Sequence, residues 1–222
     1  NPSGRVIGLQ SLQDLIERAQ RHDFVIVSDE CYSEIYRVED QPPPSLLTAA
    51  AAMGNTEYRH CLVFHSLSKR SNAPGLRSGF VAGDSDLIDA FFRYRTYHGC
   101  AMPPATQDAS IRAWQDERHV LENRRLYREK FSAVTDILAP VLEAQLPPAG
   151  FYLWPQTPID DQEFSRHLYQ QQNVVVLPGS YLSRDTVAGN PGKNHVRLAL
   201  VAPLDECVEA AQRIRTFIES LN

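Results

Sequence analysis

The sequence predicts an α/β protein in which a larger α/β part is followed by a smaller α+β part. Short apolar runs of strand length, Phe24–Val27 and Leu62–His65, alternate with segments of helical spacing. In Ser11–Arg21 the apolar residues fall on one helical face. Two prolines after Met102 separate these elements from a long helical stretch, and shorter strands and helices follow.

The first part is expected to form a small sheet with helices around it. Ser11 is the expected N-cap of the first helix, because serine oxygens accept the free N–H groups of a first turn. The prolines at 42–44 place a loop after the first strand. The expected elements are helices over 11–21, 49–53 and 84–97 and strands over 24–27, 62–65 and 78–82.

The second part is expected to begin with a helical stretch over 105–144, interrupted near 118–123 and strained by Pro140. The charged run 116–130 is interpreted as a solvated helix face. Strands are expected near 151–154, 174–177 and 196–201, and helices near 161–171 and 204–221. The predicted domains are 1–104, a bridging segment 105–146, and 147–222.

Composition excludes several kinds of partner. Net charge is −5, so no basic field for nucleic acid is expected. No apolar run approaches the roughly 20 residues that span a bilayer, so no membrane partner is expected. The histidines lack zinc-site spacing, and no metal is expected. The four cysteines lack C-x-x-C pairing, which is typical of free thiols in a reducing compartment, and a cytoplasmic location is expected.

The most informative motif is Ser66-Leu67-Ser68-Lys69, with Arg77 eight residues after the lysine. A lysine that reacts with an aldehyde must have lost its proton, and a dry or cationic setting favours that state. If Leu62–His65 is a buried strand, Ser66 and Lys69 lie at its carboxyl end, where open α/β sheets bind ligands. Arg77 and the Ser66 hydroxyl then suit a phosphate. The alternative is a surface lysine and arginine in a loop.

Three further segments accompany this motif. The chain opens with the turn Asn1-Pro2-Ser3-Gly4, the strand at Phe24 ends in Ser28-Asp29-Glu30-Cys31-Tyr32, and a late arginine, Arg197, lies in an apolar run. Together with Lys69 they resemble the aspartate-aminotransferase-like enzymes, the class I/II, fold type I family that depends on pyridoxal phosphate. The resemblance implies the C-terminal part of that family's three-layer α/β/α large domain plus its small α+β domain.

The resemblance assigns a cofactor role to most of these residues. Lys69 is the covalent anchor of pyridoxal 5'-phosphate and the catalytic proton carrier. Asp29 pairs with the pyridine nitrogen, which makes the ring a better electron sink. Ser66 and Arg77 bind the phosphate. Asn1 and Tyr32 both bind the phenolic oxygen.

Arg197 by the same resemblance binds the substrate α-carboxylate, a task that suits its planar fork. Each residue also has a structural alternative when taken alone. Asp29 is then a helix cap or turn residue, Tyr32 half-buried packing, and Arg197 the partner in an ion pair at a sheet edge. The joint occurrence of the motifs, in order, favours the family.

Longer stretches resemble the bacterial succinyldiaminopimelate aminotransferases of lysine and peptidoglycan-precursor synthesis. They are Ser28–Tyr36, Ser66–Asn72, Tyr94–Gly99 and Gly150–Trp154. The resemblance implies transfer of an amino group between glutamate or 2-oxoglutarate and N-succinyl-LL-diaminopimelate. The partners are then small amino and keto acids.

The family's chains are nearly twice as long, so the sequence is interpreted as the C-terminal half of an enzyme, inactive alone and a homodimer when complete. Tyr97–Cys100 either serves the dimer partner's site or forms a turn after a helix. Phe151 and Tyr152 either line the substrate pocket or join the core. Other functions remain open: another fold type I enzyme, such as a different aminotransferase or a C–S lyase, or the aminotransferase-like sensor of a transcription regulator.

Overall fold

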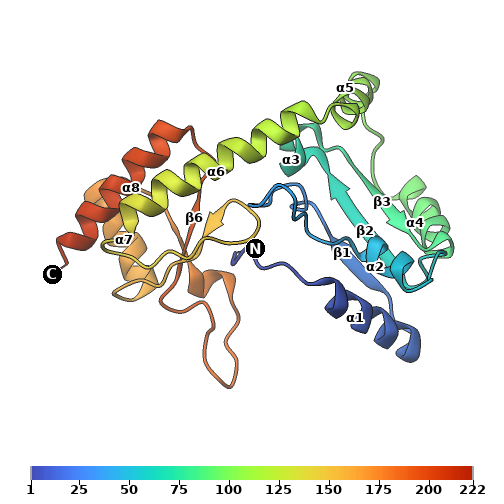
Figure 1. Ribbon diagram of the computed structural model, residues 1–222, viewed down its shortest axis with the longest axis horizontal. Coiled ribbons are helices and arrows are strands. Elements are labelled where there is room, and N and C mark those ends of the chain that lie inside the picture. The colour runs from blue at the N-terminus through green and yellow to red at the C-terminus, as the bar shows by residue number, and fades with distance from the viewer. Residues whose placement is uncertain (1, 222) are drawn as a thin grey trace. The chain divides into compact units, whose positions relative to one another are not determined.

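The structure, a computed structural model, describes residues 2–221. It contains two compact units, residues 6–124 and residues 2–5 with 125–221, which we call the Lys69 unit and the Arg197 unit (Figure 1). The division falls inside one long helix, α6 (Arg118–Leu138). The three domains expected from the sequence stay a prediction.

The Lys69 unit is built on a three-stranded sheet of order β1-β2-β3, formed by β1 (Ile26–Asp29), β2 (Cys61–Ser66) and β3 (Gly79–Gly83). β1 and β2 are parallel, and β2 and β3 are antiparallel. The carboxyl ends of β1 and β2 therefore lie at the same edge of the sheet.

Helices α1 (Leu9–His22) and α2 (Leu46–Ala52) share a core with this sheet. Ile16 and Ala49 from the helices and Val63 from β2 are among its buried residues. The remaining helices of the unit are α3 (Leu67–Arg70), η1 (Pro74–Leu76), α4 (Ser85–Tyr97) and α5 (Pro104–Gln115).

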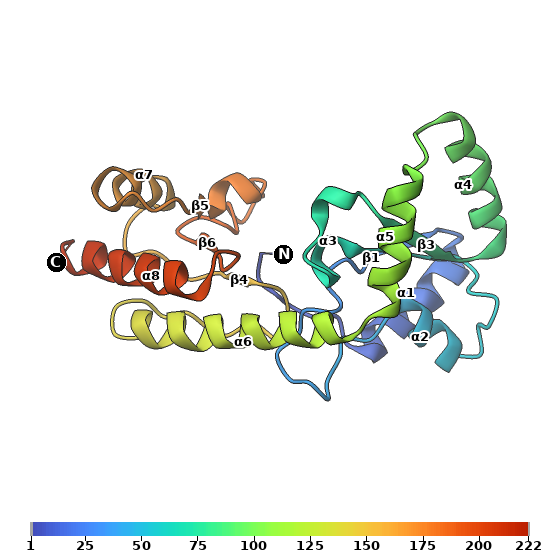
Figure 2. The ribbon, with the colours of Figure 1, turned by 90° about the horizontal axis from the view of Figure 1, so that it is seen from above.

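The Arg197 unit has an antiparallel sheet of order β4-β6-β5, formed by β4 (Tyr152–Leu153), β5 (Leu177–Pro178) and β6 (Val196–Ala199). α7 (Asp161–Gln172) and α8 (Leu204–Glu219) pack against each other (Figure 2). Their core includes Leu138 of α6, Phe164 of α7 and Phe217 of α8. The 3-10 helix η2 (Gly179–Leu182) follows β5. Within the part of the chain described, no helix has the length and apolar character needed to cross a bilayer.

The α/β prediction is confirmed, with corrections at the element ends. The first helix begins at Leu9 with Gly8 as its N-cap, so Ser11 is not the cap. The Leu12 N–H donates to the Gly8 carbonyl at 3.1 Å, so Ser11 already lies within the first helical turn. The first strand begins at Ile26 rather than Phe24, because the Phe24 N–H still closes the end of α1 through the Ala19 carbonyl.

The long helical stretch is broken earlier and ends sooner than expected. α5 ends at Gln115 and α6 begins at Arg118, whose N–H donates to the Asp116 carboxylate at 3.1 Å. α6 ends at Leu138 instead of continuing to residue 144. The residue before a proline disfavours helical backbone, so Pro140 terminates the helix rather than straining it.

The interpretation of residues 116–130 as a solvated face was wrong at Arg124, whose side chain is 6% exposed. Its guanidinium pairs with Glu34 and Glu39 and packs over the Tyr36 ring, with 4.5 Å from the guanidinium carbon to the centroid. Burial alone would lower the pKa of Arg124, but the Glu39 hydrogen bond and the nearby acidic groups raise it overall. Arg124 thereby anchors the segment that follows β1.

Candidate active site

Three residues predicted for the site lie at the carboxyl edge of the β1–β2 pair. Asp29 is the last residue of β1 and Ser66 the last residue of β2. The parallel register places Asp29 opposite Phe64, two residues before Ser66. Lys69 follows in α3, which begins directly after β2. The strand ends thus present a carboxylate, a hydroxyl and an amine together.

Cys31 connects these groups, although no sequence motif indicated a role for it. Its backbone N–H donates to the Asp29 carboxylate at 3.1 Å, and the Ser66 hydroxyl donates to its sulfur at 3.3 Å. Burial is the largest influence on the Cys31 thiol and raises its pKa; the Asp29 charge acts in the same direction, while Ser66 and Lys69 oppose it. Asp29, Ser66 and Lys69 are therefore all close enough to Cys31 to influence its thiol, and they form a polar cluster at the end of β1.

Lys69 is half-buried, and its amine lies 5.6 Å from the centroid of the Tyr32 ring. That distance is within the range of a cation–π contact. Tyr32 lies in the turn directly after β1, where the Ile35 N–H donates to the Tyr32 carbonyl at 3.0 Å. The structure therefore brings Tyr32, Asp29, Ser66 and Lys69 into one region.

The backbone next to Arg77 is held close to this region. Its neighbour Ser78 accepts the Leu67 N–H at 3.0 Å, and Gly79 pairs with Ser66 in the β2–β3 ladder. The Arg77 side chain itself is exposed, and its Nη1 donates to the Pro74 carbonyl at 2.9 Å. Its φ of 52° is a left-handed conformation that costs a non-glycine residue about 1–2 kcal/mol. Strain of this kind is concentrated at functional sites.

Asn1 lies outside the described residues. The turn that it opens ends at Gly4, whose φ is 65° and whose carbonyl accepts the Ala149 N–H at 3.3 Å. A Cβ at Gly4 would lie 2.3 Å from the Ala149 carbonyl oxygen. Glycine is therefore required at this close approach.

Arg197 belongs to the Arg197 unit, on β6 between the buried Val196 and Leu198. Its side chain points away from their core, and its guanidinium carbon lies 4.5 Å from the Tyr152 ring centroid. Tyr152 in turn lines a cavity, while Phe151 is buried and stacks on Tyr127 with centroids 5.4 Å apart. Tyr152 therefore lines a cavity, whereas Phe151 belongs to the packed interior beside Tyr127.

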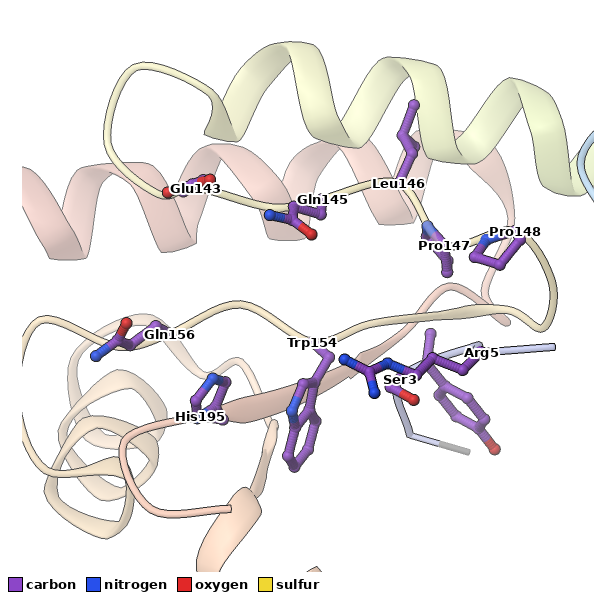
Figure 3. A pocket seen from close by; sticks show the side chains of 11 residues that line it. Ser3, Arg5, Glu143, Gln145, Leu146, Pro147, Pro148, Trp154, Gln156 and His195 are labelled. Carbon is purple, nitrogen blue, oxygen red and sulfur yellow. The ribbon is translucent and has the colours of Figure 1, made fainter. Parts of the chain in front are cut away.

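The cavity has a volume of about 370 Å³ and lies within the Arg197 unit. In Figure 3, Trp154 and His195 come from the chain around β4 and β6, and Glu143 and Gln145 from the segment that connects α6 to β4. The Trp154 and His195 rings stack, with centroids 5.5 Å apart. Arg5 supplies a guanidinium to the lining. The cavity therefore combines an aromatic wall with charged groups of both signs.

Asp161 is a second buried residue that the motifs did not indicate. Its carboxylate accepts the N–H groups of Ser180 at 2.9 Å and Asn194 at 3.0 Å, and its side chain is fully buried. Burial acts to raise the pKa of Asp161, but these hydrogen bonds lower it overall. The bond to Asn194 fixes the chain three residues before Arg197. Asp160 is the N-cap of α7 and Asp161 is the first residue of the helix, and nothing in the sequence distinguishes Asp161 from other acidic residues of a first turn.

The segment after α4 forms a turn. α4 ends at Tyr97, Arg95 Nη1 donates to the His98 carbonyl at 2.8 Å, and Gly99 has a φ of 132°. These contacts support the turn interpretation of Tyr97–Cys100. The homodimer stays a prediction.

The residues at the carboxyl edge have the chemistry that pyridoxal phosphate requires. An amine can bind its aldehyde, a carboxylate its pyridine nitrogen, and a hydroxyl with a guanidinium its phosphate. All four kinds of group belong to the Lys69 unit and lie on β1, on β2 or in the segment between β2 and β3. The donor set therefore fits the cofactor.

A sheet with paired strand ends, a lysine helix and this donor set are the features of an α/β protein suited to bind pyridoxal phosphate. The chain belongs to the aminotransferase class I and II family, whose model matches residues 1–214 and whose members depend on pyridoxal phosphate.

Its relatives include aminotransferases named for diaminopimelate or its succinyl derivative. An aminotransferase structure from Neisseria meningitidis is 51% identical, with a TM-score of 0.91 over 98% of this chain and 55% of that one. A "probable N-succinyldiaminopimelate aminotransferase" from Thermus thermophilus is 28% identical, with a TM-score of 0.82 over 97% and 56%. The LL-diaminopimelate aminotransferase of Aquifex aeolicus is 31% identical over 97% of this chain and 54% of its own length. The chain thus spans about half the length of the curated relatives it matches.

Proposed function

We propose that this chain carries the lysine and the substrate-binding arginine of a pyridoxal-phosphate-dependent aminotransferase. The enzyme transfers an amino group between glutamate and 2-oxoglutarate on one side and a second amino acid on the other. The observation that carries the proposal is the gathering of Asp29, Ser66 and Lys69 around Cys31 at the carboxyl ends of two parallel strands.

Each site residue has a role that its chemistry permits. Lys69 would hold the cofactor at its aldehyde carbon and would move a proton to and from the substrate Cα. Asp29 holds a proton on the pyridine nitrogen. Ser66 and Arg77 bind the phosphate, and Tyr32 donates a hydrogen bond to the phenolic oxygen.

Two residues complete the set. Asn1 supplies a second hydrogen bond to the phenolic oxygen. Arg197 binds the substrate α-carboxylate through its planar fork, and its packing on Tyr152 limits the orientations of the guanidinium. When bound, pyridoxal phosphate supplies an electron-withdrawing ring that weakens the bond from the substrate Cα to its hydrogen.

N-succinyl-LL-diaminopimelate is the substrate we propose. The relatives named for diaminopimelate or its succinyl derivative support it. The cavity lined by Tyr152 lies next to the Arg197 contact, and its volume of about 370 Å³ suits a long substrate side chain. Arg5 in its lining offers a cation to a distal carboxylate.

The test is an absorption spectrum of the complete protein loaded with pyridoxal phosphate. Glutamate is added first, and N-succinyl-LL-diaminopimelate is added to a separate sample. Conversion of the cofactor band to the pyridoxamine form by both compounds supports the reaction and the substrate. Conversion by glutamate alone rejects the substrate and retains the aminotransferase. A band that neither compound alters rejects the aminotransferase and favours the sensor.

A further inference from the structure

Lys69 lies in α3, a helix of four residues. A helix this short does not persist alone, because forming its first turn costs more conformational entropy than one hydrogen bond returns. Ser66 holds the start of α3: its hydroxyl accepts the Ser68 N–H at 3.4 Å. The last carbonyls of a helix lack partners within it. The contacts at the end of α3 therefore determine where Lys69 lies.

Asn123 of α6 supplies one of these contacts directly. Its Nδ2 donates to the backbone carbonyl of Lys69 at 3.2 Å. Asn123 is half-buried and lies within the first two turns of α6, inside the Lys69 unit. The side-chain amide thus stabilises a carbonyl at the end of α3, and that carbonyl belongs to the lysine itself.

Arg70 supplies the second contact and is 3% exposed. Its Nη1 donates to the Ala113 carbonyl at 2.8 Å, and its Nη2 reaches the Trp114 carbonyl at 3.5 Å and pairs with Glu117. Ala113 and Trp114 are in the last turn of α5, where free carbonyls and the helix dipole attract a cation. The guanidinium carbon also lies 4.9 Å from the Trp114 ring centroid. Arg70 therefore ties the residue next to Lys69 to the end of α5.

Trp114 is itself fixed by the sheet. Its ring lies 5.5 Å from His65 of β2 and 5.2 Å from Phe80 of β3, measured between centroids. The support therefore forms a closed set of contacts: the sheet positions Trp114, Trp114 and α5 position Arg70, and α6 holds the Lys69 carbonyl.

We propose that Asn123 and Arg70 are positioning residues for Lys69, and this inference rests on the proposed function. Asn123 acts through the lysine's own carbonyl, and Arg70 acts through the adjoining peptide. Together they fix the backbone from which the flexible lysine side chain reaches the cofactor aldehyde and the substrate Cα. A displacement of about 1 Å in such a group costs about 10²-fold in rate.

The experiment compares Asn123→Ala and Arg70→Lys with two control variants in the complete protein. The control variants are Arg112→Lys and Asp108→Ala, because both residues are exposed on α5. Amide hydrogen exchange of residues 67–71 is measured by mass spectrometry, together with kcat and KM for transamination. In Asn123→Ala, exchange at 67–71 should accelerate at least about 10-fold while distant segments are unchanged. Its kcat should fall about 10- to 100-fold with KM within about 3-fold.

Arg70→Lys keeps the charge but loses the fork, and it should show the same pattern. Unchanged exchange at 67–71 in Asn123→Ala overturns the proposal, and so does an unchanged kcat in an active enzyme. Acceleration spread evenly over the Lys69 unit also overturns it, because it indicates general destabilisation. If the wild-type protein does not transaminate, the proposed function fails. The amide hydrogen exchange of residues 67–71 in Asn123→Ala still decides whether Asn123 holds the backbone of Lys69 in place.

Discussion

Replacing Asp161 by asparagine should destabilise the Arg197 unit and isolate the contribution of one buried carboxylate. Asp161 accepts two backbone N–H groups, from Ser180 and Asn194, in a fully buried position. Asparagine retains one accepting oxygen, so about one charge-assisted hydrogen bond is lost, which costs about 1.5–3 kcal/mol. Its NH₂ group also faces a backbone N–H, and the buried donor left unpaired costs a further ~1–3 kcal/mol.

The expected loss is therefore about 2.5–6 kcal/mol in the free energy of unfolding, measured by urea denaturation at pH 7. Asp205→Asn is the matched control, because Asp205 is exposed on α8 and its replacement should change stability by less than about 0.5 kcal/mol. A loss below about 1 kcal/mol for Asp161→Asn would refute the reasoning, since the hydrogen bonds would then contribute little beyond neutral ones.

The same variant has a defined pH dependence. The pKa of Asp161 is lowered in the folded protein from an ordinary value of 3.8. A lowered folded pKa gives stability that is complete above the unfolded pKa and is lost as pH falls through the folded value. The difference between the wild-type protein and Asp161→Asn should thus be constant from pH 7 to about 5 and narrow below about 4. If the difference disappeared between pH 7 and 5, the stability difference would have to come from the titration of another group.

Three other predictions address the site and its support. Asp29→Asn should lower kcat on the order of 10²-fold, as for loss of one electrostatic contact to the reacting group, with pyridoxal phosphate still bound; kinetics near wild type would place the pyridine partner elsewhere. Arg197→Leu should raise KM for α-carboxylate substrates roughly 10- to 100-fold, from the loss of a charged hydrogen bond, and an unchanged KM would remove Arg197 from that role. Burial is the main influence that lowers the pKa of His65 in the folded protein, so the contribution of this residue to stability is complete above about pH 6.5 and declines as the pH falls below that value. Between pH 7 and 5 the wild-type protein should therefore lose more stability than His65→Gln, and equal losses would contradict this prediction.

Sequence reasoning located the residues that depend on chain order. Asp29, Ser66 and Lys69 follow apolar runs, and parallel strand ends must meet at one edge, so their proximity follows from the pattern. The first strand begins at Ile26, two residues later than the apolar run predicts, because Asp23 ends the preceding helix in a left-handed conformation. Such local closing bonds compete with a strand pattern and are not visible in hydrophobicity alone.

The supporting residues depend on tertiary contacts instead. Arg70, Asn123 and Arg124 lie in a charged stretch or beside a motif, and no spacing distinguishes them from exposed neighbours such as Arg118. Their roles arise because α5 and α6 meet the end of α3 and the segment after β1. Sequence separations of 43 to 90 residues between the paired groups make these contacts inaccessible to a local pattern.

The most direct test of the account is to identify the lysine that binds pyridoxal phosphate. The lysines of this chain are Lys69, Lys130 and Lys193, so the latter two serve as internal controls. The complete protein is loaded with the cofactor, reduced with borohydride and digested, and the modified peptide is identified by mass spectrometry. The account predicts stoichiometric modification of Lys69 and its loss in Lys69→Ala. Modification confined to other lysines, or persisting unchanged in Lys69→Ala, would contradict it.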